Sequence, residues 1–133
     1  MTDKKAVVTA VDLTGADKAG SVTSYGICTN GDVVIAPISG VKGASPQDIL
    51  KGAKTAHNTI CASVPDGGKH PFPNIKQLDI AIAGPRAVLK GKCSDGRDID
   101  GALVTDLPNL QAKAEITANL INEKFCKPKG LGI

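Results

Sequence analysis

The chain has 133 residues, a length that fits one domain able to bury a hydrophobic core. Its formal net charge of +3 comes from charges of both signs scattered along the chain, which contains one tyrosine, two phenylalanines and no tryptophan. Nucleic-acid-binding proteins carry a dense basic stripe or aromatic side chains on which bases stack, so nucleic acid is disfavoured as a partner. The core must instead be built from Val, Ile, Leu and Ala.

The N-terminal segment lacks the continuous apolar stretch of a secretory signal, and no run approaches the roughly 20 apolar residues of a membrane span. The chain has four cysteines, at positions 28, 61, 93 and 126. None forms a C-x-x-C pair, which argues against a structural zinc site or a thioredoxin-type motif. These features predict a cytoplasmic protein with reduced thiols, no metal and no cofactor.

His57 and Cys61 lie one helical turn apart, a pairing that could lower the pKa of the thiol or bind a metal. No third partner accompanies them in the sequence. A buried cysteine beside a surface histidine is the simpler explanation.

The first elements predicted in chain order are a helix and a hairpin. Residues Lys5 to Leu13 place Val7, Ala10 and Val11 on one helical face, which favours a helix, although the run VVTAV also suits a strand. Segments 21–29 and 32–38 read as two strands. The dipeptide Asn30-Gly31 between them predicts a hairpin with a type I′ turn, because both residues tolerate a positive φ.

A helix is predicted to begin at Ser45-Pro46. The serine hydroxyl can cap the helix, the proline stands where no N–H is needed, and Asp48 supplies an acid in the first turn. Apolar residues at helical spacing form one face of this segment: Ile49, Ala53, Ala56 and Ile60.

The second half predicts a loop and a three-stranded meander. Val64 to Asn74 is rich in proline and glycine and should be an exposed loop. Gln77 to Ala83 alternates apolar and polar residues, as a half-buried strand does. Gly84-Pro85 turns the chain, and Ala87 to Cys93 and Ile99 to Val104 complete the meander.

A final helix is predicted to start near Pro108 and to have two faces. The apolar face should contain Ile116, Leu120, Ile121 and Phe125. The polar face should contain Lys113, Asn119, Asn122 and Glu123.

Together these elements predict a single α+β domain over residues 1–133. The sheet should be antiparallel, with the N- and C-terminal helices on one side and the middle helix on the other. The run GICTNGD from Gly26 also resembles GKCSDGR from Gly91, and each is followed by a strand and a helix. This similarity is what a duplication would leave, although strand-turn-strand units need similar turn residues in any case.

Several runs resemble the profilin family and together extend over nearly the whole chain. They read LTGADKA from Leu13, YGICTNGDVVIA from Tyr25 and SPQDI from Ser45, which match the N-terminal helix, a hairpin and a helix start in profilins. The run GPRAVLKGK from Gly84 is similar to a later profilin hairpin. The resemblance implies a non-enzymatic, monomeric cytoskeletal protein that binds monomeric actin. It also implies binding to acidic phospholipid head groups.

The resemblance places the actin-binding surface on the second-half hairpin and the last helix. Because actin is acidic, cations there would steer association and set register. The implied binding residues are Arg86, Lys90, Lys92, Arg97, Lys113 and Asn119. Each could instead be a solvated side chain at a strand edge, where lysine discourages pairing with another sheet.

The chain departs from profilins where those proteins bind proline-rich ligands. Profilins use an aromatic cluster with tryptophan near the N-terminus and tyrosine at the C-terminus, on which polyproline II helices pack. Here tryptophan is absent and the C-terminus reads KGLGI. Proline-rich ligands are therefore expected to bind weakly or not at all.

Two other classes stay open from the sequence. A small α+β domain with a repeated hairpin could be a homodimeric regulatory module of the roadblock or longin kind, which would use an exposed apolar helix face. An enzyme is the other class. Candidate catalytic groups exist, but their separations place no triad, so we expect no enzymatic activity. These groups are Ser24, His57, Cys61, Ser63 and Asp79.

Overall fold

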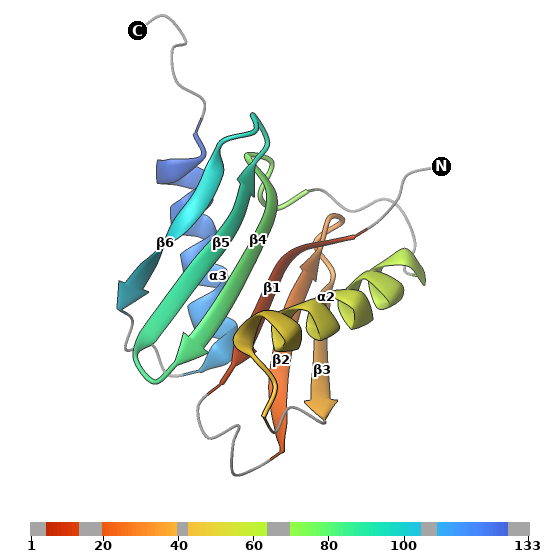
Figure 1. Cartoon of the computed structure of the whole chain (residues 1–133). Coiled ribbons are helices and arrows are strands. Elements are labelled where there is room, and N and C mark those ends of the chain that lie inside the picture. Colours follow the sequence, from red (N-terminus) through yellow and green to blue (C-terminus); the bar gives the residue numbers. More distant parts are fainter. Residues whose placement is uncertain (1–4, 14–19, 40–42, 64–69, 105–108, 128–133) are drawn as a thin grey trace, which may run out of the picture.

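The computed structural model of the chain describes residues 5–13, 20–39, 43–63, 70–104 and 109–127. They form six strands, two helices and a short π-helical turn (Figure 1). The strands are β1 (Ala6–Asp12), β2 (Ser21–Cys28), β3 (Val33–Ser39), β4 (Ile75–Ala83), β5 (Arg86–Cys93) and β6 (Asp98–Val104). The helices are α2 (Pro46–Ser63) and α3 (Leu110–Leu120), which continues into the π-helical turn η1 (Ile121–Phe125).

All six strands belong to one sheet in the order β3-β2-β1-β4-β5-β6. Neighbouring strands are antiparallel except β1 and β4, which are parallel. The α+β class is confirmed, whereas the fully antiparallel sheet is wrong at this one pair. Hairpins enforce antiparallel pairing within each half of the sheet, but the chain between β1 and β4 contains β2, β3 and α2, a connection long enough for parallel strands.

The predicted helix over residues 5–13 is wrong, because this segment is the central strand β1. Ala6 to Val11 are all buried, since helices cover both faces of the sheet at this strand. A strand buried on both faces is apolar throughout and shows no alternation, so periodicity does not separate it from a buried helix. The β-branched residues of VVTAV carried the correct signal.

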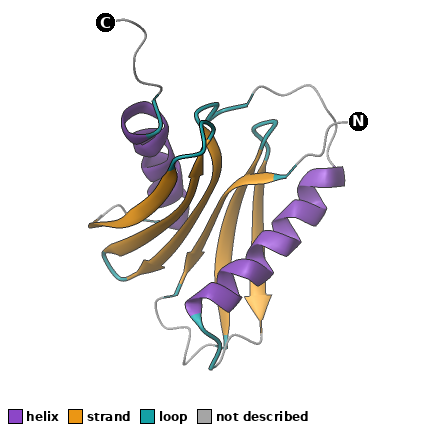
Figure 2. Cartoon of the chain, turned by 45° about the horizontal axis from the view of Figure 1, so that its top comes forward, coloured by secondary structure: helices purple, strands orange, loops and turns teal. Residues whose placement is uncertain are grey.

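The two helices lie on opposite faces of the sheet (Figures 1 and 2). α2 packs mainly on β1, β2 and β3. Its N-terminal half buries Ile49 and Ala53 against Val11 and Val22. α3 covers the larger core on the other face, where its residues Ala114 and Ala118 belong to one cluster with side chains of β1, β2, β4, β5 and β6. Neither helix among the described residues has the length and apolar character needed to cross a lipid bilayer.

The two halves of the chain repeat one structural unit. β5 begins 65 positions after β2 and β6 begins 65 positions after β3, with equal lengths in each pair. In both halves a strand precedes this hairpin and a helix follows it. The parallel pair β1–β4 relates the units by an approximate twofold axis along the strands, which explains why the helices lie on opposite faces. The similarity of the two glycine-containing runs thus extends to the structure.

Both hairpins use the same turn, and it differs from the predicted type I′ turn. Gly31 donates its N–H to the Cys28 carbonyl at 2.9 Å, and Gly96 donates to the Cys93 carbonyl at 3.0 Å. Both glycines have φ +94°, whereas Asn30 and every other described non-glycine residue avoid positive φ. A type I′ turn needs two successive positive φ values, so the geometry is instead a type I turn followed by a glycine bulge.

Each helix also fastens the start of its own first strand through an asparagine. The Asn58 carboxamide oxygen accepts the Ala6 N–H at 2.9 Å, and the Asn122 oxygen accepts the Asn74 N–H at 2.9 Å. Asn58 stands three positions before Cys61 of α2, whereas Asn122 stands four positions before Cys126. The π-helical turn η1 accommodates this extra residue, as single π turns in α-helices do.

The prediction of reduced thiols is wrong, because all four cysteines are paired. The disulfides join Cys28 to Cys61 and Cys93 to Cys126, each across 33 positions. Each ties the end of a hairpin strand to the helix that follows it. Sequence spacing could not give this connectivity, since four cysteines allow three pairings.

The buried faces of the helices also differ from the predictions. On α2 the buried face continues from Ile49 and Ala53 through His57 and Cys61, while Ile60 is 41% exposed. On α3 the buried residues are small, and the large side chains expected in the core are exposed, except Ile121. The exposed ones are Ile116, Leu120 and Phe125. Asn122, expected on the polar face, is buried by its bonds to Asn74.

Some predictions fall outside the described residues. These are residues 14–19 of the first profilin-like run, residues 64–69 of the predicted loop, Pro108 at the predicted helix start, and the terminal segment 128–133.

Replacing both cysteines of either disulfide with alanine should lower the free energy of unfolding by about 3–4 kcal/mol, as loop-closure entropy predicts for a separation of this size. Because both disulfides span 33 positions, the two double variants should lose similar amounts. Urea unfolding of the oxidised protein and both variants measures this, with the reduced protein as a further reference. An unchanged unfolding midpoint in either variant would contradict the pairing.

Candidate functional site: the open strand face and the groove beside α2

The second half of the sheet leaves one face uncovered. α2 packs mainly on β1, β2 and β3, so the strands β4, β5 and β6 are open on the α2 side (Figure 2). We call this surface the open strand face. Arg86, Val88, Lys90 and Lys92 alternate along β5 with the buried residues of the other face. The neighbouring strands contribute Gln77, Asp79, Ala81 and Ala83 from β4, and Asp98, Asp100, Ala102 and Val104 from β6.

The strands of this face carry three cations, Arg86, Lys90 and Lys92, and three carboxylates, Asp79, Asp98 and Asp100, of which only some form ion pairs. Lys92 forms an ion pair with Asp98 at 2.7 Å, which lowers the pKa of that carboxyl group, and Lys54 of α2 pairs with Asp79 at 2.9 Å. No described residue forms an ion pair with Arg86 or Lys90. Both cations are exposed on a strand of the sheet, and Asp79 and Asp100 stand opposite Lys90 on the two neighbouring strands.

The structure brings together only half of the six predicted binding residues. Arg86, Lys90 and Lys92 share the open strand face. Lys113 lies on α3, which covers the opposite face, and its ammonium group donates to the Gly84 carbonyl at 3.3 Å. Asn119 is exposed on the same helix, so neither α3 residue can join a patch on the open strand face.

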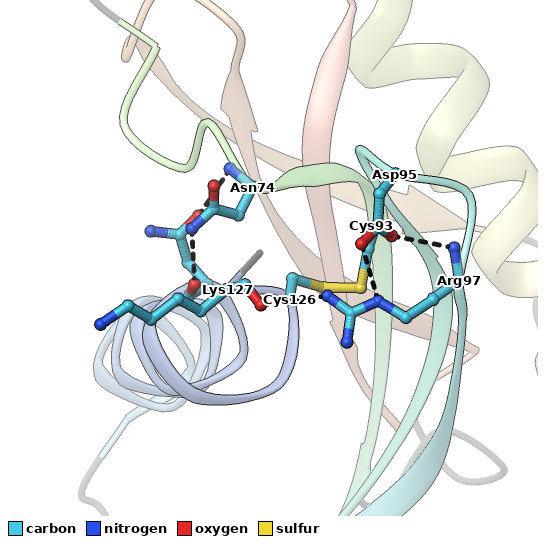
Figure 3. A network of polar contacts seen from close by, with 7 residues as sticks. Asn74, Cys93, Asp95, Arg97, Cys126 and Lys127 are labelled. Carbon is cyan, nitrogen blue, oxygen red and sulfur yellow. Dashed lines mark hydrogen bonds and ion pairs between the residues drawn. A yellow bond between two sulfur atoms is a disulfide. The ribbon is translucent and has the colours of Figure 1, made fainter. Parts of the chain in front are cut away.

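Arg97, the sixth residue, is engaged within the fold (Figure 3). Its side chain bonds to the Asp95 carboxylate at 2.8 Å and to the Lys127 carbonyl at 3.2 Å. The guanidinium group also lies 5.9 Å from the centre of the Phe125 ring. Beside the Cys93–Cys126 disulfide, Arg97 thus holds the end of the last helix against the hairpin.

A groove runs between α2 and the open strand face, and its first part is apolar. This part is a cavity of about 290 Å³. It is lined by Leu13, Pro46, Gln47, Leu50, Asp79, Ala81, Ala83, Val88 and Lys90. The cavity exists because the β4 residues that line it, Ala81 and Ala83, have small side chains. Val88, which is 42% exposed, forms part of its wall.

The second part of the groove is basic. It lies toward the C-terminal half of α2 and has a volume of about 310 Å³. It is lined by Lys5, Ala6, Thr29, Lys54, Asn58, Lys76 and Gln77. The Lys54–Asp79 ion pair stands between the two parts and joins α2 to β4 at 2.9 Å, with Lys54 lining the basic part and Asp79 lining the apolar part. We call the whole the α2 groove.

The duplicated fold shows what distinguishes this groove. The residue of β2 that stands 65 positions before Lys90 is Tyr25, which is buried against α3. Its hydroxyl group donates to Glu115 of α3 at 2.9 Å, and burial is the main cause that raises its pKa. The Tyr25 ring therefore fills the space beside α3, whereas the equivalent position beside α2 is occupied by Lys90.

Ser24 and His57 form a buried pair with no catalytic geometry. The Ser24 hydroxyl group donates to the Ala36 carbonyl at 2.7 Å, so it accepts a hydrogen bond from His57 Nε2–H at 2.8 Å. A base that activates serine must accept that proton, and here the roles are reversed. Both residues are fully buried, so no substrate can reach them.

The pair instead packs α2 onto β2. Any side chain at position 26 would clash with the His57 ring, which explains the glycine there. No described residue bonds to His57 Nδ1. The predicted surface position of His57 is wrong, and its pairing with Cys61 as a reactive thiol or a metal site is excluded because Cys61 is in a disulfide. Within the described residues no cluster of His, Cys, Asp and Glu could hold a metal ion.

Sequence reasoning found Lys90 but missed the groove that it borders. Gln47, Leu50, Lys54 and Asn58 recur at helical spacing and line one side of α2. This stripe is the signal that could have found the groove. The parallel pairing of β1 with β4, which places α2 beside β4, has no comparable signal in the sequence.

Comparison of the chain with known protein families, curated protein sequences and solved structures found no match.

Acidification should destabilise the protein through its buried histidine. Burial lowers the pKa of His57, and likewise that of His70, so the unfolded chain binds protons near pH 6.5 that the folded chain does not. The stability contribution of the two neutral histidines is therefore complete above about pH 6.5. Below that pH the free energy of unfolding falls by at most about 1.4 kcal/mol per pH unit for each histidine.

Urea unfolding at about pH 7.5 and about pH 5 measures this dependence. His57→Gln, whose amide can still donate to Ser24, should show a smaller difference in unfolding free energy between the two pH values. His70→Asn measures how much of that difference comes from His70, the more accessible histidine. A pH dependence identical in His57→Gln and the original protein would refute the role of His57.

Proposed function

We propose that the protein is a non-enzymatic interaction domain that binds an acidic partner protein through the open strand face. The observation that carries the proposal is the position of Arg86 and Lys90, two cations without an ion-pair partner among the described residues, on a strand of a stiff sheet. Such cations accelerate encounter with an acidic surface and fix the register of docking. A fixed backbone also keeps the entropic cost of binding low.

The resemblance to profilins makes monomeric actin the first partner to test. In this proposal the binding residues are Arg86, Lys90 and Lys92, with Val88 between the cations as an apolar contact. Lys113 and Asn119 are left out because they lie on the other face of the sheet. Acidic phospholipid head groups, which the same resemblance implies, serve as a comparison ligand.

The two disulfides bear on where such binding takes place. Disulfides form and persist in oxidising compartments and are rare in the cytosol. We therefore propose that the protein works in an oxidising environment, in place of the cytoplasmic and cytoskeletal location expected from the sequence. Because monomeric actin belongs to the cytoskeleton, it serves here as a model of the acidic partner surface on which the proposal rests.

The double variant Arg86→Glu, Lys90→Glu should bind monomeric actin about tenfold more weakly than the original protein, because two attractive contacts become repulsive. Fluorescence titration at about 0.05 M and about 0.2 M salt should also show weaker binding at the higher salt concentration. The control Lys51→Glu, Lys124→Glu changes charge equally at exposed positions on the helices.

Equal loss in both double variants would mean that only net charge matters and would overturn the proposed surface. No saturable binding at tens of micromolar by the folded, disulfide-bonded protein would remove actin as the partner. Stronger binding to anionic vesicles than to protein would replace the partner class with a lipid surface.

A second candidate function, a homodimeric regulatory module, is favoured by the outer side of α3. Ile116 and Leu120, one helical turn apart, are 51% and 41% exposed, and Phe125 is exposed farther along the same segment. Adjacent exposed apolar side chains mark interaction surfaces.

If this surface joins two copies, sedimentation velocity should show a dimer at tens of micromolar, and Ile116→Ser with Leu120→Ser should return the protein to a monomer. The matched control is Thr55→Ser with Thr59→Ser on the exposed side of α2. A monomer at all concentrations would exclude this candidate.

A further inference from the structure

The α2 groove consists of two separate cavities along one side of α2, with the Lys54–Asp79 ion pair between them. Its wall on α2 is formed by Gln47, Leu50, Lys54 and Asn58, and its opposite wall and floor come from β4 and β5. The two cavities lie end to end along the helix, because residues 46–50 line the apolar part and residues 54–58 line the basic part. An occupant of both cavities must therefore be elongated and must pass over the Lys54–Asp79 ion pair.

The apolar part fits an aliphatic side chain. Leu50, Ala81, Ala83 and Val88 surround a cavity of about 290 Å³, and its one acidic residue, Asp79, is already paired with Lys54. Burying a leucine or isoleucine side chain in such a site is favourable because it removes apolar surface from water. This part alone supplies an anchor without charge preference.

The basic part supplies the charge preference. Lys5, Lys54 and Lys76 contribute three cations, and Asp79 at the junction neutralises one of them. Thr29 and Asn58 add polar groups, although the Asn58 oxygen is engaged by the Ala6 N–H. A segment with two carboxylates complements the remaining charge, whereas a basic segment would be repelled.

The distance between the two parts fixes a spacing. From the middle of residues 47–50 to the middle of residues 54–58 is about seven to eight helical positions, or roughly 11 Å at 1.5 Å per residue. An extended peptide covers about 3.3 Å per residue, so this distance corresponds to three or four residues. In a bound peptide, the aliphatic residue and the first carboxylate should therefore stand about that many residues apart.

We propose that the α2 groove binds an extended acidic peptide segment in which an aliphatic residue stands about four positions from a pair of carboxylates. The inference rests on the proposed function, since it names the kind of segment that the acidic partner presents. It extends the contact region, because Lys5 and Lys76 lie outside the open strand face. The two regions share Gln77, Asp79, Ala81, Ala83, Val88 and Lys90.

The test uses a synthetic peptide with blocked ends in which a leucine is followed, after three serine or glycine residues, by two aspartates. Titration into the folded, disulfide-bonded, isotope-labelled protein should shift the amide resonances of residues 76–83 and 47–58. Two control peptides have the same length. One places the leucine directly beside the aspartates, and the other replaces the aspartates with lysines.

Variants separate the two parts of the groove. Lys5→Glu with Lys76→Glu should weaken binding of the spaced peptide about tenfold or more, because two attractive contacts become repulsive. Val88→Asp should also weaken it by placing a charge in the apolar part. Lys51→Glu with Lys124→Glu, outside the groove, should leave binding unchanged.

Tighter binding of the spaced peptide than of both controls, lost in the groove variants, would establish the inference. Equal binding of the spaced and unspaced peptides, or no shift at millimolar peptide, would overturn it. If acidic proteins still bind and Arg86→Glu with Lys90→Glu abolishes that binding, only the groove inference fails. If the spaced peptide binds but no acidic protein does, only the proposed function fails.

Discussion

The parallel pairing of β1 with β4 is the constraint on which the rest of the structure depends. Each half of the chain is a strand, a hairpin and a helix, and each alone has one covered and one open sheet face. Parallel pairing turns one half over relative to the other, so the helices lie on opposite faces. The β4–β6 half is therefore open on the α2 side. The open strand face and the α2 groove follow from this arrangement.

The two halves have the same frame but different interiors. Disulfides, glycine turns and helix asparagines recur at equivalent places, because they hold each helix to its own strands. Side chains that only fill space have diverged. Tyr25 closes the side next to α3, whereas Lys90 stands at the corresponding strand position next to α2. The repeated frame thus carries a buried aromatic ring in one half and an exposed cation in the other.

Local signals predicted much of this fold. The glycine-containing turns, the Ser45-Pro46 helix start and the strand alternation from Gln77 onward gave the hairpins and α2 nearly within a residue or two of their bounds. The sequence failed where tertiary context decides. β1 is buried on both faces and lacks alternation. The disulfides join positions whose proximity exists only after folding, and α3 buries alanines because small residues let it lie close to the sheet.

The same distinction bears on function. The pair with the residue types of an active site, Ser24 and His57, is buried with its hydrogen bonds in the non-catalytic direction. Arg86 and Lys90, which form no ion pair with any residue that the structure describes, lie instead on the strand face beside a groove. Buried polar groups with internal partners stabilise a fold, whereas cations kept accessible on rigid strands contribute little to stability. Binding is thus the role that the accessible groups can serve.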